Sequence, residues 1–394
     1  HRLLGVVQVQ VDTVGSSGSE LSLDALEMDR AEALRDFILR RKEDLVPETE
    51  EAPKPGEEPV ATRPTSSQTE DLMRLRLGDL LRVGLTQNHL QTVGILLGFL
   101  FTTLNLFDDI WTPENLVDWA LQAAGIDLSG WGWVITLYTI ALIIVSFVAT
   151  LVRTILEYFD LRLQRLEDGF KLTAGLLNRR EQIARFRRLQ WVRWRVNPLQ
   201  ARLGLHSVQL HQAGPGEKGK ARAITIPGAL IGDRVRIVSP YASEADQEGM
   251  AYRGISRKMV GRFLLWIGFL PMSGFVVLLI VEAQYGALPF TALWPLLVWW
   301  SVRHYQRHYR WGWNGRLLHL HHRFFGTRDT LVWAHKLQSV KLSQGLYQRR
   351  KRLADLELHT ASGDLTIPYL PVAEARTLRD HLLWTLETSR ADWM

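Results

Sequence analysis

Apolar positions along the chain gather in two long stretches without lysine or arginine, residues 91–152 and 263–302. Each stretch holds a pair of apolar runs, at about 91–107 and 131–152, and at about 263–281 and 287–302. A helix needs about 20 apolar residues to cross the hydrocarbon core of a bilayer. The pattern predicts two transmembrane helical hairpins. Buried core helices of a large soluble protein are the alternative.

Basic residues crowd the outer flanks of both stretches. They are Arg74, Arg76, Arg82, Arg153, Arg162 and Arg165 around the first, and Arg253, Arg257, Lys258, Arg262, Arg303, Arg307, Arg310 and Arg316 around the second. Cytoplasmic flanks of membrane spans carry an excess of lysine and arginine. We therefore expect all folded soluble parts to lie in the cytoplasm, and both short connections to lie on the other side.

The soluble parts repeat. At an offset of 148 residues, Leu189-Gln190 corresponds to Leu337-Gln338, and Leu210-His211 corresponds to Leu358-His359. A third copy is partial: the segment 2–15 resembles 202–214, and 21–39 matches 365–383. Repetition at a fixed spacing indicates one structural unit used several times. We expect the chain to begin inside such a unit.

Each copy has a similar local pattern. Alternating apolar residues predict strand pairs around Val208 and Ile224, and around Leu356 and Leu365. Asp168-Gly169 is typical of a hairpin turn. Residues 373–388 carry leucines at helical spacing and predict a closing helix. Residues 28–41 predict a similar helix in the first copy, whereas the middle copy shows no clear one. Strands closed by a helix favour a small α+β or barrel-like domain.

The segment from Leu161 to Leu210 carries a more specific pattern. It contains the Asp168-Gly169 turn, a stretch with Gly175, Leu176, Arg179 and Arg180, and the sequence NPLQARLGLHSVQL from Asn197 to Leu210. These features resemble the bacterial membrane-flanked PH-like domain family of the YdbS/YdbT type, and residues 350–358 match it again. The resemblance implies PH-like domains with a bent seven-stranded sheet and a capping helix. It implies no catalytic residues.

Pattern and resemblance together predict a membrane α + β protein, in which two transmembrane hairpins alternate with PH-like β-rich domains, each capped by a helix. We expect these parts: the C-terminal part of a first PH-like domain (1–44), a disordered Pro/Glu linker (45–70), a juxtamembrane helix from Asp71 to His89 with the first hairpin (71–152), a second PH-like domain (153–252), the second hairpin (253–305) and a third PH-like domain (306–394).

The chain carries a net charge of +6, and its soluble parts hold dense basic runs. The binding candidates are Arg179, Arg180, Arg185, Arg187, Arg188, Arg193, Arg195, Arg349, Arg350, Lys351 and Arg352. Near a negatively charged leaflet each such residue contributes about 1 kcal/mol. The runs therefore predict contact with anionic lipid headgroups or with protein partners, and a solvated surface is the alternative. They lack a nucleic-acid recognition motif, so we expect no nucleic-acid partner.

Other chemical signals are weak. The sequence GPGEKGKA at 214–221 approaches a phosphate-binding loop, but Ala221 replaces the hydroxyl residue that would hold Mg²⁺. His304 and His308 are spaced for zinc on a helix, yet the glutamate of H-E-x-x-H is missing. Without cysteine the chain has no disulfide or thiolate site. We expect no cofactor, no resident metal and no enzyme activity, with an envelope-lipid enzyme as a minor alternative.

These observations predict a non-catalytic multi-pass scaffold or adaptor in the bacterial plasma (inner) membrane. Its cytoplasmic PH-like domains would bind anionic lipid, a protein partner or a sister membrane-flanked PH-like protein. The apolar runs contain no Asp, Glu, Lys, Arg or His, which disfavours an ion or proton pathway. The alternative is a transport, export or resistance component that protects against membrane-active compounds.

Overall fold

A computed structural model describes residues 6–11, 21–27, 30, 70–87, 94, 131–214, 222–282 and 285–389. The chain divides into two compact units, one with residues 1–73, 163–172 and 181–394, the other with 74–162 and 173–180. Each is described by itself. Apart from Arg30, Glu70 and Gly94, the expected helix at 28–41, the 45–70 linker and the run at 91–107 lie outside the described residues.

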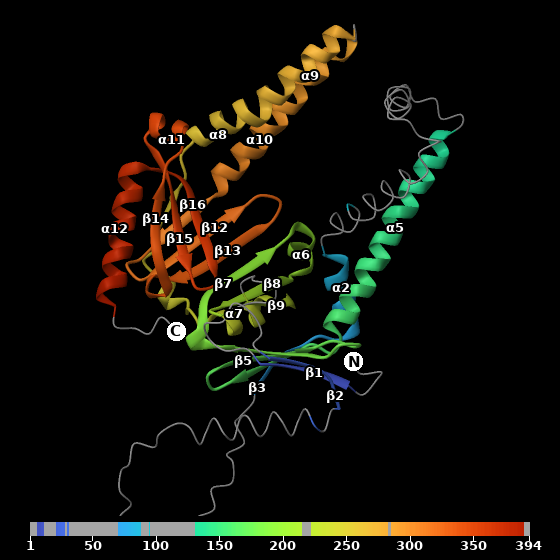
Figure 1. Ribbon diagram of the computed structural model, residues 1–394, viewed down its shortest axis with the longest axis vertical. Coiled ribbons are helices and arrows are strands. Elements are labelled where there is room, and N and C mark those ends of the chain that lie inside the picture. Colours follow the sequence, from blue (N-terminus) through green and yellow to red (C-terminus); the bar gives the residue numbers. More distant parts are fainter. Residues whose placement is uncertain are drawn as a thin grey trace, which may run out of the picture. The chain divides into compact units, whose positions relative to one another are not determined.

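The first unit contains a seven-stranded antiparallel sheet in the order β10-β11-β12-β13-β7-β8-β9. Its strands are β7 (Leu189–Val196), β8 (His206–Gln212), β9 (Arg222–Ala229), β10 (Ala251–Gly254), β11 (Arg310–Trp313), β12 (Leu317–Arg323) and β13 (Thr327–Trp333). β7 pairs with β13, so strands of the second and third repeats form one sheet (Figure 1). The sequence did not predict this junction.

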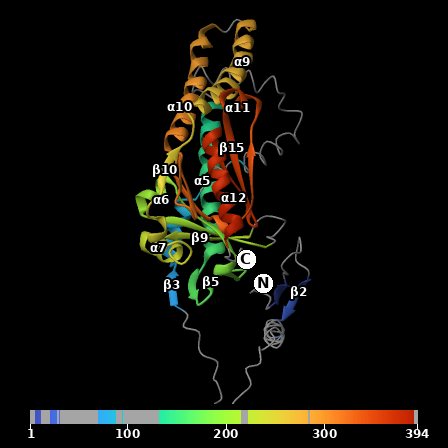
Figure 2. The same ribbon diagram turned by 90° about the vertical axis from the view of Figure 1, so that its left-hand side faces the viewer.

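The third repeat closes with a second sheet and a long helix. The sheet consists of β14 (Leu337–Ser343), β15 (Leu353–Thr360) and β16 (Gly363–Pro371), and the helix is α12 (Val372–Thr388), which lies along this sheet in Figure 2. Leu356, Leu358 and Leu382 are fully buried between them. Burying each such side chain contributes about 1.5–3 kcal/mol. The strands and the helix expected here from the sequence are confirmed.

The second repeat has corresponding elements. A sheet in the order β3-β4-β5-β6 contains β3 (Glu70–Arg74), β4 (Arg162–Leu166), β5 (Gly169–Ala174) and β6 (Arg180–Arg185). The turn between β4 and β5 holds Asp168, as expected. Short helices follow: the 3-10 turn η1 (Phe186–Arg188), α6 (Pro198–Leu203), α7 (Ile231–Val238) and η3 (Ala245–Gln247). α7 packs on β8 and β9, so the middle copy has the closing helix that its sequence did not reveal.

The N-terminal part of the chain contains β1 (Val6–Val11) and β2 (Leu21–Glu27), which pair antiparallel. In the repeat alignment they correspond to β8 and β16.

Two residue ranges differ from the sequence prediction. The expected helix from Asp71 to His89 begins as the strand β3, and among its described residues 71–87 the helical part is α2 (Leu77–Leu85). The expected span at 287–302 starts as the 3-10 segment η5 (Tyr285–Ala292) and becomes α-helical in α10 (Leu293–His308). In both repeats a short strand, β3 or β10, precedes the apolar helices. The expected domain ranges stay predictions.

Two described helices are long and apolar enough to cross a membrane, by length and composition: Ile140–Tyr158 within α5 (Trp131–Tyr158), and Lys258–Val281. The second comprises α8 (Lys258–Phe263), the π-helical segment η4 (Leu264–Phe269) and α9 (Leu270–Val281). α9 and α10 run side by side (Figures 1 and 2). Two transmembrane hairpins stay a prediction.

Candidate anion-binding site

Three arginines meet on one face of the seven-stranded sheet. Arg193 and Arg195 are two residues apart on β7, and side chains at that spacing point to the same face of a strand. Arg195 is paired with Arg328 of β13, and Arg328 is paired with His322 of β12. We call Arg193, Arg195 and Arg328 the arginine cluster.

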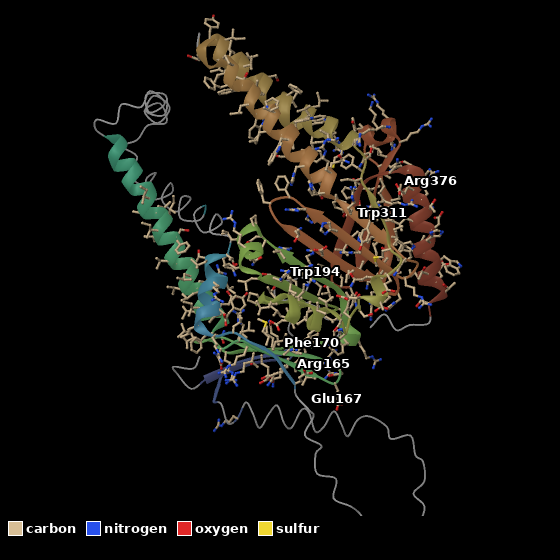
Figure 3. All side chains as sticks on the ribbon, turned by 180° about the vertical axis from the view of Figure 1, so that it is seen from behind. Arg165, Glu167, Phe170, Trp194, Trp311 and Arg376 are labelled. Atoms are coloured by element: carbon tan, nitrogen blue, oxygen red, sulfur yellow. The ribbon has the colours of Figure 1, made fainter. Side chains whose placement is uncertain are left out.

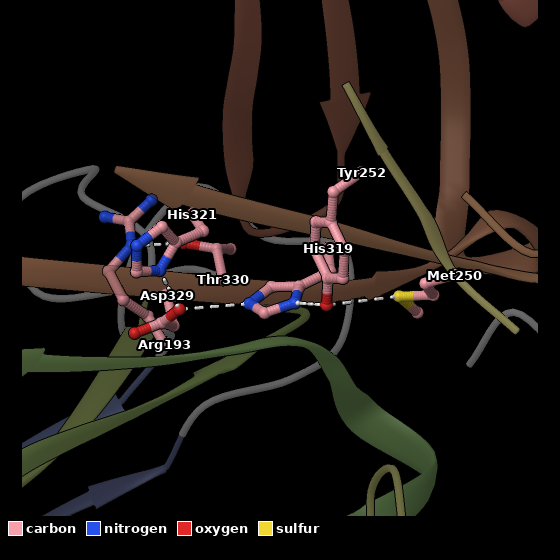
Figure 4. A network of polar contacts seen from close by, with 7 residues as sticks. All are labelled: Arg193, Met250, Tyr252, His319, His321, Asp329 and Thr330. Atoms are coloured by element: carbon pink, nitrogen blue, oxygen red, sulfur yellow. Dashed lines mark hydrogen bonds and ion pairs between the residues drawn. The ribbon is translucent and has the colours of Figure 1, made fainter. Parts of the chain in front are cut away.

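Two contacts position the Arg193 side chain. Its Nε donates to Thr330 Oγ1 at 3.0 Å, as Figure 4 shows, and its guanidinium carbon lies 4.4 Å from the ring centroid of Trp191. Burial, and after it the charges of Arg195 and Arg328, lower the pKa of Arg193 to about 10. The charged form is therefore less favourable here than in water.

Arg195 is held less completely. Its Nε is buried and has no hydrogen-bond partner in the described structure. Burial, and then the charge of Arg328, lower the pKa of Arg195. Within the described ranges no ion pair joins a carboxylate to any member of the arginine cluster. A buried donor without an acceptor costs about 1–3 kcal/mol, more for a charged group, so the cluster favours an incoming anion.

Two histidines border the arginine cluster. The pKa of His211 is lowered to about 3 and that of His322 to about 4, first by burial and then by neighbouring arginines. Both rings are therefore neutral at pH 7, and each can supply an N–H donor. Neither nitrogen of His211 has a partner among the described residues, and the ring stacks on Trp191 at 3.3 Å between centroids.

The cluster lies close to one end of the sheet. There the turn Phe324–Gly326 joins β12 to β13, and Phe325 is 67% exposed. The ring of Phe324 lies 6.2 Å from that of His304, which is near the end of α10. A side chain at Gly326 would overlap the carbonyl of Val196, so only glycine allows β7 to approach this turn closely.

A polar network occupies the opposite face (Figure 4). The carboxylate Oδ1 of Asp329 lies 3.1 Å from His319 Nε2 and 2.6 Å from His321 Nδ1. Because an ionised carboxylate only accepts, both nitrogens donate to it. His319 Nδ1 then accepts from the hydroxyl of Tyr252 at 2.7 Å. The network joins β10, β12 and β13 by side-chain hydrogen bonds.

The charges of this network follow from its contacts. Burial raises the pKa of Asp329, but the hydrogen bonds from His319 and His321 outweigh burial and lower it to about 2. The hydrogen bond to Asp329 raises the pKa of His321. Burial and the charge of Asp329 raise the pKa of Tyr252, which makes its hydroxyl a poor nucleophile at neutral pH. The arrangement is suited to holding strands together.

Most of the predicted basic residues stay apart from the cluster. Arg180 pairs with Glu157 at 3.1 Å, and Arg185 lies 3.6 Å from Asp168. The remaining candidates are exposed: Arg179 before β6, Arg187 and Arg188 in η1, and Arg349, Arg350, Lys351 and Arg352 in or directly after α11 (Leu346–Lys351). Arg349 and Arg352 line a shallow depression at the start of α12. Of the basic residues predicted from the sequence, Arg193 and Arg195 are the two that belong to the arginine cluster.

Three tryptophans of the sheet are buried, Trp191 and the two labelled in Figure 3, Trp194 and Trp311. His304 and His308 of α10 face each other with ring centroids 4.3 Å apart, but His308 Nδ1 contacts the carbonyl of His304 at 2.8 Å. In the part of the chain that the structure describes, no group of three or more His, Asp or Glu side chains is arranged to hold a metal.

Antiparallel sheets closed by a C-terminal helix define the class of these repeats as PH-like domains. The family described as bacterial PH domain matches residues 99–230 and 262–384. These segments cover more than half of the chain, so the chain belongs to the bacterial PH domain family. The resemblance is confirmed at this level, and the YdbS/YdbT type stays a prediction. A search of curated proteins and a search of solved structures returned no match.

Proposed function

We propose that this bacterial PH domain protein is a non-catalytic, multi-pass membrane scaffold or adaptor of the long YdbT-like type. Its PH-like domains lie on the cytoplasmic side of the plasma membrane and bind anionic lipid or protein partners. The family supports a binding role, because PH-like domains are non-catalytic binding modules. The observation that carries the proposal is the half-buried arginine cluster without a carboxylate among the described residues.

The exposure of the apolar helices supports membrane attachment. The most apolar window of the helix Lys258–Val281 has a mean hydropathy of 2.4, yet only 11% of this window is buried; for Ile140–Tyr158 the values are 2.1 and 17%. A core helix of a soluble protein would bury these side chains, because exposed apolar surface is unfavourable in water. Lipid tails would cover them instead. The arginine residues that flank both apolar stretches support the same attachment.

Membrane topology tests the proposal directly. The chain has no cysteine, so single introduced cysteines report on accessibility without a background. We expect A201C and S339C, at exposed positions of the second and third repeats, to resist a membrane-impermeant maleimide in intact cells. G286C, between α9 and α10, should react. Labelling of A201C or S339C from outside would refute the proposed orientation.

Transport is the function to distinguish from a scaffold. Purified chain reconstituted into vesicles should not raise the leakage or flux of membrane-active dyes above that of empty vesicles. Protein-dependent flux would replace the scaffold proposal by the transport or resistance alternative.

A further inference from the structure

We infer that Arg193, Arg195 and Arg328 bind the phosphate of an anionic phospholipid headgroup, with Phe325 entering the apolar boundary of the same leaflet. The inference rests on the proposed function and names the ligand and its site. The site combines strands of two repeats, so neither PH-like domain forms it alone.

The charges of the site fit a phosphate. Three guanidinium groups on neighbouring strands repel one another, and burial has removed part of their water. A phosphate oxygen accepts hydrogen bonds from several N–H groups and offsets this repulsion. Guanidinium is planar and matches two phosphate oxygens at once, which a lysine at these positions would not do. The neutral rings of His211 and His322 can add N–H donors.

The position of the site favours a lipid as the source of the phosphate. Arg328 is the second residue of β13, directly after the turn that carries Phe325. The neighbouring Phe324 contacts His304, two residues beyond the last apolar run of the sequence. If α9 and α10 enter the bilayer, His304 lies at the headgroup level. Phe325 then lies at the depth where aromatic side chains favour the membrane interface.

The arginines near the end of α10 also support a position at the level of the lipid headgroups. Arg303 and Arg307 lie on either side of His304 along this helix. Cytoplasmic arginines at the end of a span attract anionic lipids, and thereby raise their concentration next to the site. The local concentration and the fixed geometry act together: the flank gathers anionic headgroups, and the arginine cluster holds one of them.

Calorimetry on the purified full chain in a neutral detergent tests the inference. The probes are dioctanoyl-phosphatidylglycerol and its zwitterionic counterpart dioctanoyl-phosphatidylcholine. We expect the wild type to prefer phosphatidylglycerol, and R193Q/R195Q/R328Q to bind it about tenfold or more weakly. The single variant R328Q removes one of the mutually repelling charges, so it should fold. Its affinity for phosphatidylglycerol should be about fivefold lower than that of the wild type. If R328Q binds phosphatidylglycerol as tightly as the wild type does, the assignment of the site is wrong.

A matched control removes the same charge elsewhere. R202Q/R236Q/R376Q changes three exposed basic residues that are not among the binding candidates, and Arg376 is labelled on α12 in Figure 3. Its affinity should equal that of the wild type. An equal loss in this control and in the cluster variant would overturn the site but leave binding to anionic lipid, and so the proposed function, in place. Absence of any preference in the wild type would remove both the site and the lipid part of the proposed function.

Two further measurements identify the source of the phosphate. F325S should weaken association of the full chain with bilayer nanodiscs containing phosphatidylglycerol, while leaving the affinity for inorganic phosphate unchanged. Inorganic phosphate should displace the lipid only at far higher concentration. If it competes as well as the lipid does, or if F325S binds nanodiscs like the wild type, a free phosphate replaces the lipid and the inference is overturned.

Discussion

The indole Nε1 of Trp294 donates a hydrogen bond to the carbonyl of Ile267 at 2.8 Å. Ile267 precedes Pro271 by four residues, and proline has no N–H to donate to that carbonyl. The freed carbonyl lies within the π-helical segment η4, and Trp294 on the neighbouring helix α10 supplies the missing donor. In lipid no water can replace it, so proline inside a span requires such a neighbour.

Replacing Trp294 should loosen the hairpin. W294F keeps an aromatic side chain but removes the donor, and we expect a loss of about 1 kcal/mol in stability. Unfolding of the full chain in detergent, followed against the mole fraction of dodecyl sulfate, measures the loss. W299F is the control, because Trp299 is on the same helix and similarly exposed. Equal midpoints for the two variants would show that the Ile267 carbonyl does not depend on Trp294.

The histidine network predicts a pH dependence of stability. The pKa of His321 is raised in the folded protein, so its bond to Asp329 stabilises the fold fully below the ordinary histidine pKa, about 6.5. This contribution is lost as pH rises through the raised pKa. Asp329, with a pKa of about 2, stays ionised throughout. H321Q should therefore lower the melting temperature more at pH 6 than at pH 9.

The control for the histidine network is H381Q, because His381 is an exposed histidine of α12. It should change the melting temperature equally little at both pH values. If H321Q lowers the melting temperature by the same amount at pH 6 and at pH 9, the charge of His321 does not stabilise the network.

The sequence predicted those elements whose side-chain pattern repeats. β15 and β16 alternate buried and exposed residues, and α12 buries Ala375, Leu378 and Leu382 at helical spacing. α7 escaped prediction because only its last two residues, Ile237 and Val238, are buried, while Ile231 is exposed. β3 and β10 have five and four residues, too few for a periodic signal.

The sequence predicts only part of the candidate site. Arg193 and Arg195 stand two apart in a strand and so share a face. Arg328 joins them through the pairing of β7 with β13, which connects two repeats and leaves no local pattern. The basic runs around Arg187 and Arg350 are dense along the chain, although the side chains of these two arginines are exposed. Density of charge along the chain does not reveal which charges meet in space.

The arginine cluster should cost stability when no anion is bound. Removing one of three mutually repelling charges by R328Q should raise the stability of the ligand-free chain by up to about 1 kcal/mol at low salt. Salt screens the repulsion, so the gain should shrink as ionic strength rises. Melting temperatures at two salt concentrations measure this, with R376Q as the exposed control. A lower melting temperature for R328Q at low salt would contradict the repulsion.

The junction between the two repeats depends on Tyr241. Its hydroxyl donates to the carbonyl of Gln190 at 2.7 Å and accepts from the backbone N–H of Trp333 at 3.4 Å. It thereby links β7 of one repeat to β13 of the next, and burial raises the pKa of this hydroxyl. Lys336 reinforces the junction, because its Nζ donates to the carbonyl of Arg187 at 2.9 Å.

Y241F should weaken this junction by about 1–2 kcal/mol, because it removes both hydrogen bonds of a buried hydroxyl. Hydrogen exchange at the Trp333 amide should accelerate more than exchange in β15, which lies away from the junction. Y285F changes an exposed tyrosine and is the control. If the two amides accelerate equally, the repeats unfold as one unit and Tyr241 stabilises the whole rather than the junction. If neither accelerates beyond the control, the two hydrogen bonds do not hold the repeats together.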